Sequence, residues 1–454
     1  MQARVVSPLR RQIRHVRGGR VFVPGTFSAR RTRPVACCVR IDRMAGWLPY
    51  ERGQVVRDTR DDHAKLREAW RVIRARREEG LPVVNLTGLE RAFAPDEADL
   101  ALLDDELAPA MLGERLCELA LEHLGGDPDE HDAFLVNRTT AGLVATMQVV
   151  VPPGGVVVGV SAGYSHPAVV RAVTLAGGRI VDTVGAEAFV RALANEPRVD
   201  AVVLTRLAVT YEALPADELD VIVAATRAQG IVLVVDDAGG ARVGPAVLGQ
   251  PRTLELGADV GVTGLDKYGV TGPRLGLLAG RRDLVDAIRA RAIELGLEAR
   301  PMLLPAAIRS LEQYRPERVR ELVATTQKLG DALEPHLGAA LARTPFTLKV
   351  RGAGILEAAD AADSVVPVEA TAALAMQLLR DHGLLTVHFA AVPPGTPDLL
   401  LKFVPPETLS SLGGADALAE AIAGSFERST DVLRSGERLG ELLYGAALTR
   451  TGSG

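Results

Sequence analysis

The fold is decided by a stretch in the second half of the chain, Val262-Thr263-Gly264-Leu265-Asp266-Lys267-Tyr268-Gly269. Lys267 follows an apolar run, and it stands out because the chain uses lysine rarely. Of 52 lysines and arginines, five are lysines: Lys65, Lys267, Lys328, Lys349 and Lys402. A lysine amine can lose its proton and form a Schiff base, whereas an arginine guanidinium cannot. A lysine kept in so arginine-rich a chain therefore indicates a chemical role for its amine.

Short apolar runs alternate with helix-like segments on the N-terminal side of Lys267. The runs are Ala133–Val136, Val156–Val160, Arg179–Val184, Ala201–Leu204, Ile231–Val235 and Asp259–Thr263. Continuous apolar runs are typical of strands that are buried on both faces, and their alternation with helices predicts a parallel α/β sheet. Because such sheets bind ligands beyond the carboxyl ends of their strands, we expect functional side chains directly after each run.

The first of these strand ends suits a phosphate group. After Ala133–Val136 the chain opens an apolar-periodic helix with Asn137, Arg138, Thr139 and Thr140. The first amides of a helix have no partner within the helix, and the helix dipole is positive there, so this start can bind an anion. A plainer interpretation is that Thr139 and Thr140 are ordinary N-caps.

Flat and acidic side chains follow the later runs. Tyr164 and His166 come after Val156–Val160 and could stack on a ring, while Asp236 comes directly after Ile231–Val235. Each has a plainer interpretation, since His166 can be a structural histidine and Asp236 can cap a turn. The combination of all these residues at strand ends is what indicates a ligand site.

Pyridoxal 5'-phosphate uses this whole set of side chains. Its aldehyde would meet Lys267, its phosphate the helix start, its flat ring Tyr164 or His166, and its pyridine nitrogen Asp236. A carboxylate keeps that nitrogen protonated, so the ring accepts electrons from the substrate Cα while Lys267 transfers the proton. We therefore predict this cofactor, with Lys267, Asp236 and His166 as the catalytic candidates and no metal ion.

Several segments resemble known enzymes. They are Asn85-Leu86-Thr87-Gly88 followed by Leu89-Glu90-Arg91-Ala92, then Phe134–Thr139, Val234–Gly240 and Thr263–Gly276. Over about residues 81–314 they resemble fold type I pyridoxal-phosphate enzymes, and within these they are similar to the selenocysteine synthase (L-seryl-tRNA selenium transferase) family. The Asp-Asp-Ala segment is also similar to α-oxoamine synthases, which favours Asp236 over Asp237 at the pyridine nitrogen.

The resemblance implies a fold and a class of reaction. The implied fold is a mostly parallel sheet flanked by helices, with a smaller C-terminal α/β domain and a site at the interface of a homodimer or higher homo-oligomer. The implied reaction is elimination or replacement at Cβ of an amino acid or amino-acid-like substrate, through an aminoacrylate. Transamination or racemisation is the alternative among enzymes, and a pyridoxal-phosphate-binding protein without turnover is the alternative of another class.

The chain departs from this pattern in several places. Gly264 stands where a serine is common, so Thr263 is the expected phosphate hydroxyl. No arginine lies between Arg351 and Arg380, where an aminotransferase would hold a substrate carboxylate, and the strand Leu399–Val404 presents Lys402 instead. No dedicated domain for binding transfer RNA precedes the sheet, and the body of the chain is acidic, so a transfer-RNA partner is not expected.

Substrate anchors are sought among the arginines near these segments. Arg91, Arg206, Arg274 and Arg300 are the candidates, because a guanidinium can hold a carboxylate or phosphate with two hydrogen bonds. Arg91 is preferred because it stands in a matching segment, and Arg206 is second because it follows a strand end. With so many arginines in the chain, the alternative is that most of the four are surface residues.

The chain divides into four parts. Residues 1–43 contain eleven arginines and one acid, Asp42, and are predicted to be a disordered tail, with a nucleic-acid arm or a targeting segment as alternatives. Residues 44–105 form an N-terminal segment, 106–314 the large cofactor-binding domain, and 315–454 a connecting helix with the small domain. The apolar runs are too short to span a membrane, and the three cysteines form no disulfide framework, so a cytoplasmic location is expected.

Overall fold

The structure is a computed structural model that describes residues 48–91, 94, 96–361 and 365–445. The predicted tail of residues 1–43 lies outside the described residues, as does Ala92 of the Leu-Glu-Arg-Ala segment. In the described part of the chain, no helix combines the length and the apolar character that crossing a membrane requires.

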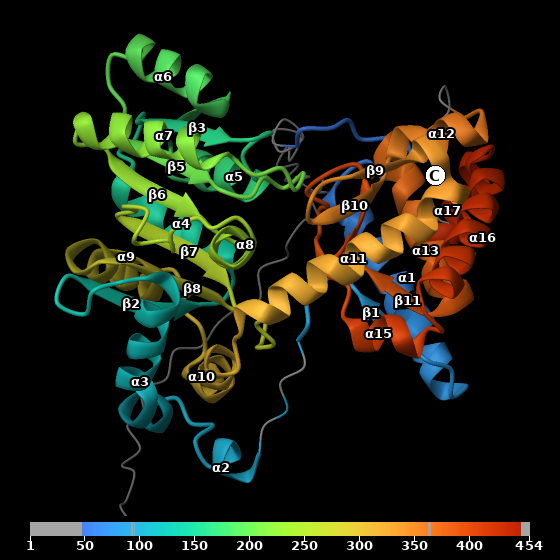
Figure 1. Cartoon of the computed structure of the whole chain (residues 1–454), viewed down its shortest axis with the longest axis horizontal. Coiled ribbons are helices and arrows are strands. Elements are labelled where there is room, and N and C mark those ends of the chain that lie inside the picture. The colour runs from blue at the N-terminus through green and yellow to red at the C-terminus, as the bar shows by residue number, and fades with distance from the viewer. Residues whose placement is uncertain (1–47, 92–93, 95, 362–364, 446–454) are drawn as a thin grey trace, which may run out of the picture. The chain divides into compact units, whose positions relative to one another are not determined.

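A seven-stranded sheet forms the middle of the chain (Figure 1). Its strand order is β2-β8-β7-β6-β5-β3-β4. The strands are β2 (His131–Val136), β3 (Val156–Ser161), β4 (Arg179–Val184), β5 (Ala201–Thr205), β6 (Val232–Asp236), β7 (Val260–Gly264) and β8 (Gly276–Arg281). The strands from β7 to β4 pair in parallel, whereas β8 is antiparallel to both β2 and β7. The six predicted strands are confirmed. The prediction missed β8, because the chain reaches it from β7 through a loop and not through a helix.

Helices cover both faces of this sheet (Figure 1). They are α3 (Leu107–Leu124), α4 (Thr139–Val150), α5 (Pro167–Leu175), α6 (Gly185–Asn195), α7 (Ala216–Ala228), α8 (Gly240–Val247), α9 (Arg282–Glu294) and α10 (Leu304–Glu312), which follows the 3-10 turn Pro301–Leu303. The short α2 (Glu97–Leu100) lies away from the sheet (Figure 1). Successive side chains of a strand point to opposite faces, so Val202 and Leu204 join one apolar core and Ala201 and Val203 the other. The continuous apolar runs of the sequence are therefore explained by burial on both faces.

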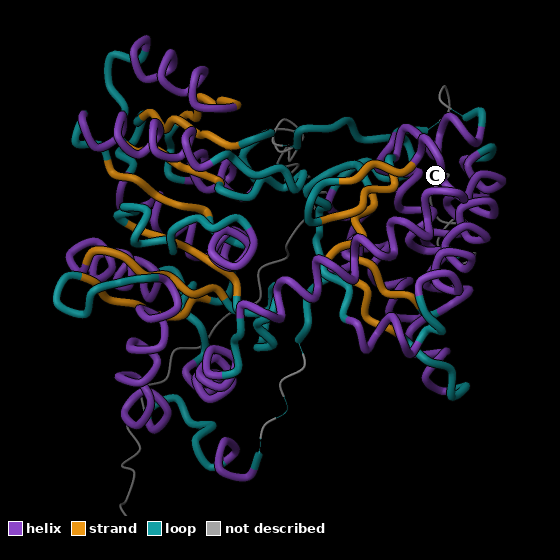
Figure 2. The backbone as a smooth tube through the Cα atoms, viewed as in Figure 1, coloured by secondary structure: helices purple, strands orange, loops and turns teal. Residues whose placement is uncertain are grey.

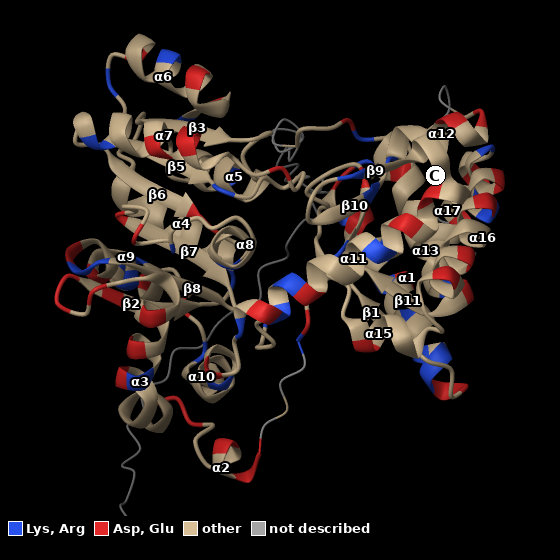
Figure 3. Ribbon diagram, in the orientation of Figure 1, with Lys and Arg blue, Asp and Glu red and all other residues tan. Residues whose placement is uncertain are grey.

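The C-terminal part begins with a long helix and contains a second, smaller sheet (Figure 2). Its strands are β9 (Leu341–Arg343), β10 (Thr347–Val350) and β12 (Leu399–Lys402), in the antiparallel order β12-β10-β9. Its helices are α11 (Pro316–Leu337), α12 (Gly352–Ala359), α13 (Pro367–His382), α14 (Val387–Ala390), α15 (Pro406–Ser411), α16 (Ala415–Leu433) and α17 (Gly436–Tyr444), with the 3-10 turn Gly338–Ala340. Charged residues of both signs lie along α11 (Figure 3), among them Glu317 and Arg320, which form an ion pair at 2.5 Å.

The strand before α14 is short. In the apolar segment Leu384–Ala391, only β11 (Leu384–Thr386) is extended, and α14 follows it at once. The partner of β11 is the three-residue strand β1 (Val84–Leu86), which pairs with it in parallel. Because β1 ends at the turn made by Asn85 and Thr87, its pairing with β11 stops at Thr386.

The N-terminal segment packs with the C-terminal part of the chain. Val56, together with Ala69 and Val72 of α1 (Thr59–Glu78), belongs to the same apolar core as Leu374 and Leu378 of α13. This core is distinct from the two cores that flank the seven-stranded sheet. The predicted division of the chain near Tyr314 stays a prediction, and the structure adds that the N-terminal segment shares its apolar core with the C-terminal part.

Candidate active site

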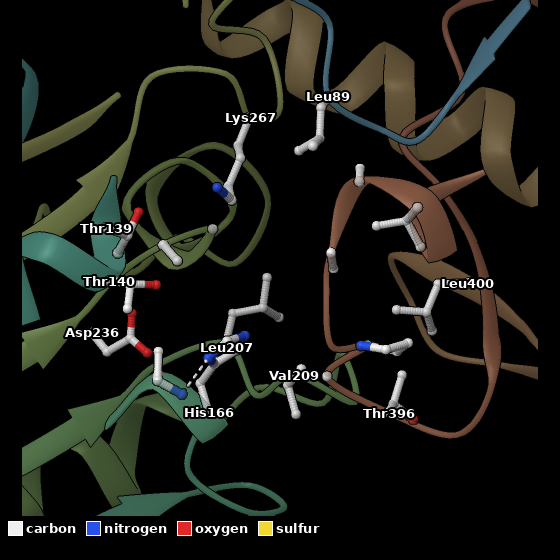
Figure 4. A pocket seen from close by; sticks show the side chains of 18 of the residues that line it. Leu89, Thr139, Thr140, His166, Leu207, Val209, Asp236, Lys267, Thr396 and Leu400 are labelled. Carbon is white, nitrogen blue, oxygen red and sulfur yellow. Dashed lines mark hydrogen bonds between the residues drawn. The ribbon is translucent and has the colours of Figure 1, made fainter. Parts of the chain in front are cut away.

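A cavity lies at the carboxyl ends of the parallel strands. One side, which we call the strand-end wall, is formed by Thr139, Thr140, His166, Asp236 and Lys267. The opposite side, which we call the C-terminal wall, is formed by residues 387–398 with Leu400 and Lys402. Figure 4 shows Lys267 and Asp236 on one side of this space and Thr396 and Leu400 on the other. The position is the one in which parallel α/β sheets bind ligands, as the sequence predicted.

Lys267 projects into the cavity from the turn after β7 (Figure 4). Its Nζ donates a hydrogen bond to Asp266 Oδ1 at 3.2 Å, and its side chain is 22% exposed. A Cβ atom at Gly264 would lie 2.6 Å from this Nζ and 3.3 Å from Thr139 Oγ1. The lysine amine therefore lies beside the start of α4, and the glycine at position 264 leaves space between them.

Asp236 ends β6 with a carboxylate that faces the cavity and lacks a partner on one oxygen. The residue is 3% exposed, and its Oδ1 is buried without a hydrogen bond. Burial, and after it the charge of Asp237, raises the pKa of Asp236 to about 7. A buried carboxylate without a partner is costly, and a cationic group in the cavity would offset that cost. Asp236 thus fits the protonated ring nitrogen of pyridoxal phosphate.

The neighbouring Asp237 has a different environment. Arg206 Nε donates to Asp237 Oδ1 at 3.0 Å, its Nη2 donates to Oδ2, and Thr253 Oγ1 donates to the same Oδ2 at 2.7 Å. Arg206 is fully buried and lies outside the cavity lining. This geometry contradicts the prediction that Arg206 binds substrate, because its guanidinium is occupied by Asp237 and by the carbonyl of Pro251.

The start of α4 supplies the expected site for a phosphate. Arg138, Thr139 and Thr140 line the cavity, and Arg138 is the residue before the helix, in extended conformation. A Cβ atom at Gly276 of β8 would lie 2.8 Å from the backbone nitrogen of Thr139, so glycine there allows the helix start to approach the sheet. Free amides and two hydroxyls at a helix start suit a phosphate group.

Two residues predicted for the phosphate lie elsewhere. Asn137 is exposed, is absent from the cavity lining, and donates from its side chain to the carbonyl of Gly296 at 3.4 Å. Thr263 is buried away from the cavity, and its hydroxyl accepts a hydrogen bond from Arg242 at 2.9 Å. A threonine that the sequence interpretation did not single out, Thr205 at the end of β5, lines the cavity with a buried hydroxyl that has no partner.

Of the two residues predicted to stack on the cofactor ring, the structure places His166 in the cavity lining and Tyr164 outside it. His166 lines the cavity, and its Nδ1 accepts a hydrogen bond from the backbone of Ala168 at 3.0 Å (Figure 4). Burial, and then the charges of Arg171 and Lys267, lower the pKa of His166 to about 3, so the ring is neutral and can lie flat against a ligand ring. Tyr164 is absent from the lining, and its hydroxyl donates to the carbonyl of Gly395 at 3.1 Å, so it supports the C-terminal wall.

Neither Arg91 nor Arg206, the two arginines that the sequence favoured as substrate anchors, lines the cavity. Arg91 is exposed and outside the lining, and Arg300 forms a surface ion pair with Asp105. Arg274 and Arg171 line the cavity instead, and burial lowers the pKa of both, that of Arg274 to about 10. Arg171 was missed because it lies within α5 and not at a strand end. Its signal in the sequence is that it is the one charged residue of that apolar helix.

Three further polar residues of the cavity were not predicted to act there. Tyr211, Tyr268 and Lys402 line it and are buried. Lys402 had a signal in the sequence, since it is one of the five lysines. Tyr211 had none, because it lies in the loop after β5 and reaches the cavity only through the fold.

Comparisons with known proteins agree with this geometry. No family model matches the chain. A protein of Methanothermobacter thermautotrophicus named UPF0425 pyridoxal phosphate-dependent protein is 29% identical over 373 residues, which cover 80% of this chain and 92% of the relative. The aspartate aminotransferase of Thermotoga maritima covers 82% of this chain and 97% of its own, with 17% identity and a TM-score of 0.51. The histidinol-phosphate aminotransferase of Sinorhizobium meliloti, solved with pyridoxal-5'-phosphate, covers 78% and 93%, with 19% identity and a TM-score of 0.53.

The chain has the fold of fold type I pyridoxal-phosphate-dependent transferases, as predicted. Among curated proteins it is similar to archaeal proteins that are named as pyridoxal phosphate-dependent without a stated reaction. The finer resemblance to the selenocysteine synthase family is not confirmed by these comparisons.

Proposed function

We propose that this chain is a pyridoxal-phosphate-dependent enzyme that acts on an amino acid or amino-acid-like substrate and eliminates or replaces a group at its Cβ. Pyridoxal 5'-phosphate is its cofactor, which the names of the curated relatives support. One observation carries the proposal: the Lys267 amine, the Asp236 carboxylate with its unpartnered Oδ1 and the start of α4 face the same cavity.

The residues of the strand-end wall have distinct roles in this proposal. When bound, the cofactor supplies an electron sink for negative charge at the substrate Cα. Asp236 holds a proton at the ring nitrogen, because its buried carboxylate is stabilised by the positive charge placed there. Thr139 and Thr140 bind the phosphate, and His166 presents a neutral flat ring. The Lys267 amine removes the proton from Cα.

Chemistry at Cβ is preferred over the alternatives on two grounds. The segments around Arg91, Asp236 and Lys267 resemble a family whose members work at Cβ, and the C-terminal wall presents Lys402 where an aminotransferase is expected to present an arginine. Transamination and racemisation remain the alternatives among enzymes. Retention of Lys267 argues against a binding protein without turnover, since such a protein does not need the amine.

The reaction type is tested with model substrates. Purified protein loaded with pyridoxal phosphate is incubated with O-phosphoserine, serine or cysteine. Release of pyruvate and ammonia is the expected result. Amino transfer to an added keto acid, or conversion of an L- to a D-amino acid, would replace the proposal with the corresponding alternative. A protein that takes up no pyridoxal phosphate would contradict the proposed cofactor.

We further propose that the protein is a homodimer or a higher homo-oligomer. Supporting this, large apolar side chains are exposed along α2 and α3, with Leu100 55% exposed, Leu107 42% and Met111 64%. Exposed apolar side chains gathered in one place commonly mark a surface for protein contact. Light scattering during gel filtration should give a mass of at least twice the 48.1 kDa of one chain, and a mass of one chain would contradict the proposal.

A further inference from the structure

Lys402 is a buried amine without an acidic partner. It ends β12, lines the C-terminal wall, and is 5% exposed. Within the described residues no carboxylate forms an ion pair with it, whereas Lys349 on the neighbouring strand β10 pairs with Glu212. Removing an ammonium from water without a counter-charge is costly, so burial favours the neutral form of this amine. Of two lysines in the same small sheet, only Lys402 therefore has an amine free for chemistry.

Two tyrosine hydroxyls bind the Lys402 amine. Its Nζ donates to Tyr268 Oη at 3.3 Å and forms a shorter hydrogen bond with Tyr211 Oη. The two hydroxyls are themselves 2.5 Å apart. Tyr268 directly follows Lys267 in the chain, so this buried group joins the C-terminal wall to the turn that carries the other amine. A continuous set of hydrogen bonds among titratable groups can redistribute a proton without water.

The backbone around this group is strained. Tyr211 has a φ of 67°, Tyr268 of 51°, and Phe403, which follows Lys402, of 48°. Bulky residues rarely adopt this left-handed region, at a cost of about 1–2 kcal/mol each. The Phe403 ring stacks on Tyr268 with centroids 3.7 Å apart, and a Cβ at Gly239 would lie 2.4 Å from the Tyr268 ring. Such strain persists where the surroundings hold it for a functional reason.

The charged and titratable groups that face Lys402 act on its proton in both directions, and burial decides the net effect in favour of losing the proton. They are Tyr211, Tyr268, Lys267, Asp266, Arg274 and His166. Burial, and then the charge of Lys267, lowers the pKa of Lys402 to about 7, while Asp266 acts in the opposite direction. An amine that exchanges its proton near neutral pH is well suited to acid–base catalysis. Electrostatics and hydrogen bonding thus agree on the same role.

Building on the proposed function, we propose that Lys402, held by Tyr211 and Tyr268, is the general acid that protonates the group leaving from the substrate Cβ. Lys267 takes the proton from Cα, and the electrons of that C–H bond form the double bond between Cα and Cβ. The bond from Cβ to the leaving oxygen breaks, and its electron pair takes a proton from the Lys402 ammonium. One proton enters Lys267 and one leaves Lys402, so the pair of amines ends with the same total charge.

Two model substrates separate this role from binding. Serine loses hydroxide, which needs a proton, whereas β-chloroalanine loses chloride, which does not. In Lys402→Met, loaded with pyridoxal phosphate, kcat for serine should fall by about 10²–10⁴-fold. The kcat for β-chloroalanine should change by less than a factor of about three, because no acid is required. Lys328→Met is the matched control, since Lys328 is exposed and does not line the cavity, and it should leave both rates unchanged.

Other outcomes overturn the proposal. An equal loss for both substrates, or a rise in KM for both with kcat kept, would show that Lys402 binds the carboxylate that the two substrates share. Lys402→Arg keeps the positive charge but does not release a proton in this range, so recovery of serine turnover by this variant would also overturn it. A wild-type protein inactive on β-chloroalanine would contradict the proposed function itself, which is a separate failure.

A measurement without turnover decides the role of Lys402 independently. Because the chain has five lysines, nuclear magnetic resonance of protein labelled with ¹³C at lysine Cε gives a small set of signals. The signal that disappears in Lys402→Met should titrate with a midpoint near pH 7 in the wild-type protein loaded with pyridoxal phosphate. A midpoint for Lys402 above about pH 9 would overturn the assignment, because the amine would then be too weak an acid.

Discussion

The two walls face the same cavity but are built in different ways. On the strand-end wall, each polar side chain lies at or shortly after the end of a strand or at the start of a helix, and the acid Asp236 has one oxygen without a partner. On the C-terminal wall, the side chains come from the short helix α14, the loop after it and strand β12, and the group without an ionic partner is the base Lys402. A buried acid and a buried base are thus kept apart across the cavity. Because neither neutralises the other, both remain available to a ligand.

The largest effect is expected from removing the amine of the strand-end wall. Lys267→Ala should lower turnover by at least about 10³-fold, because it removes both the covalent attachment and the base for the Cα proton. Borohydride reduction followed by peptide mapping should find the cofactor on Lys267 in the wild-type protein and on no peptide of the variant. Lys328→Ala is the control and should keep full attachment. Attachment of the cofactor to another lysine would contradict the assignment of the covalent role to the strand-end wall.

Substitutions of the two adjacent aspartates should have different effects, one on stability and the other on turnover. Asp237→Asn breaks a buried pair and leaves Arg206 without its counter-charge, so it should cost about 3–5 kcal/mol of unfolding free energy. Asp236→Asn removes a carboxylate that has an unpartnered oxygen and a like-charged neighbour, so it should cost little stability but lower turnover by about 10²-fold or more. Denaturant unfolding and kcat measure the two effects. A large loss of stability in Asp236→Asn would show that its role is structural.

The raised pKa of Asp236 should be visible in the pH dependence of the protein's stability. Its pKa in the folded protein is about 7, raised from the ordinary value of 3.8, so between these values the folded state holds a proton that the unfolded state has released. The stability of the cofactor-free protein should therefore fall as the pH rises from about 4 to about 7. Asp236→Asn should show a smaller fall over this window, and pyridoxal phosphate should also reduce it by supplying a positive partner. Parallel wild-type and variant profiles from thermal unfolding would contradict the proposed burial of this charge.

The smallest effect concerns a glycine that shapes the C-terminal wall. Gly88 and Gly80 both have positive φ, 68° and 73°, so alanine at either position should cost about 1–2 kcal/mol. A Cβ at Gly88 would also lie 2.6 Å from the carbonyl oxygen of Lys402, whereas a Cβ at Gly80 meets open space. Gly88→Ala should therefore cost about 1 kcal/mol more than Gly80→Ala and lower turnover. Equal costs in denaturant unfolding would show that the contact with Lys402 is unimportant.

The strand-end wall was accessible from the sequence because parallel sheets concentrate their polar side chains at one edge. Lys267, Asp236, Thr139, Thr140 and His166 were placed in this way, and all five line the cavity. The same reasoning failed for Arg206, Asn137 and Thr263. A residue after a strand can turn toward the cavity or into the protein, and hydrogen-bond partners such as Asp237 and Arg242 decide which.

The rarity of lysine in the sequence singled out Lys267, but it marks other buried lysines as well. Lys65, Lys349 and Lys402 are buried, Lys267 is half-buried, and only Lys328 is exposed. Because four of the five lysines are buried or half-buried, the composition marked Lys402 as well as Lys267. The sequence could not show which buried lysine has an acidic partner, because Glu212 reaches Lys349 from a distant loop.

By itself the sequence determined the alternation of strands and helices, the parallel sheet, and the acid, the amine and the helix start at its edge, because these depend on local patterns repeated along the chain. The tertiary structure alone decided how Tyr211, Tyr268 and Lys402 meet, since they lie far apart in the sequence and come together through the packing of β12 and a turn opened by Gly88. It also decided that Asp236 is unpartnered while Asp237 is paired. Charge pairing depends on contacts across the whole fold, which no local pattern encodes.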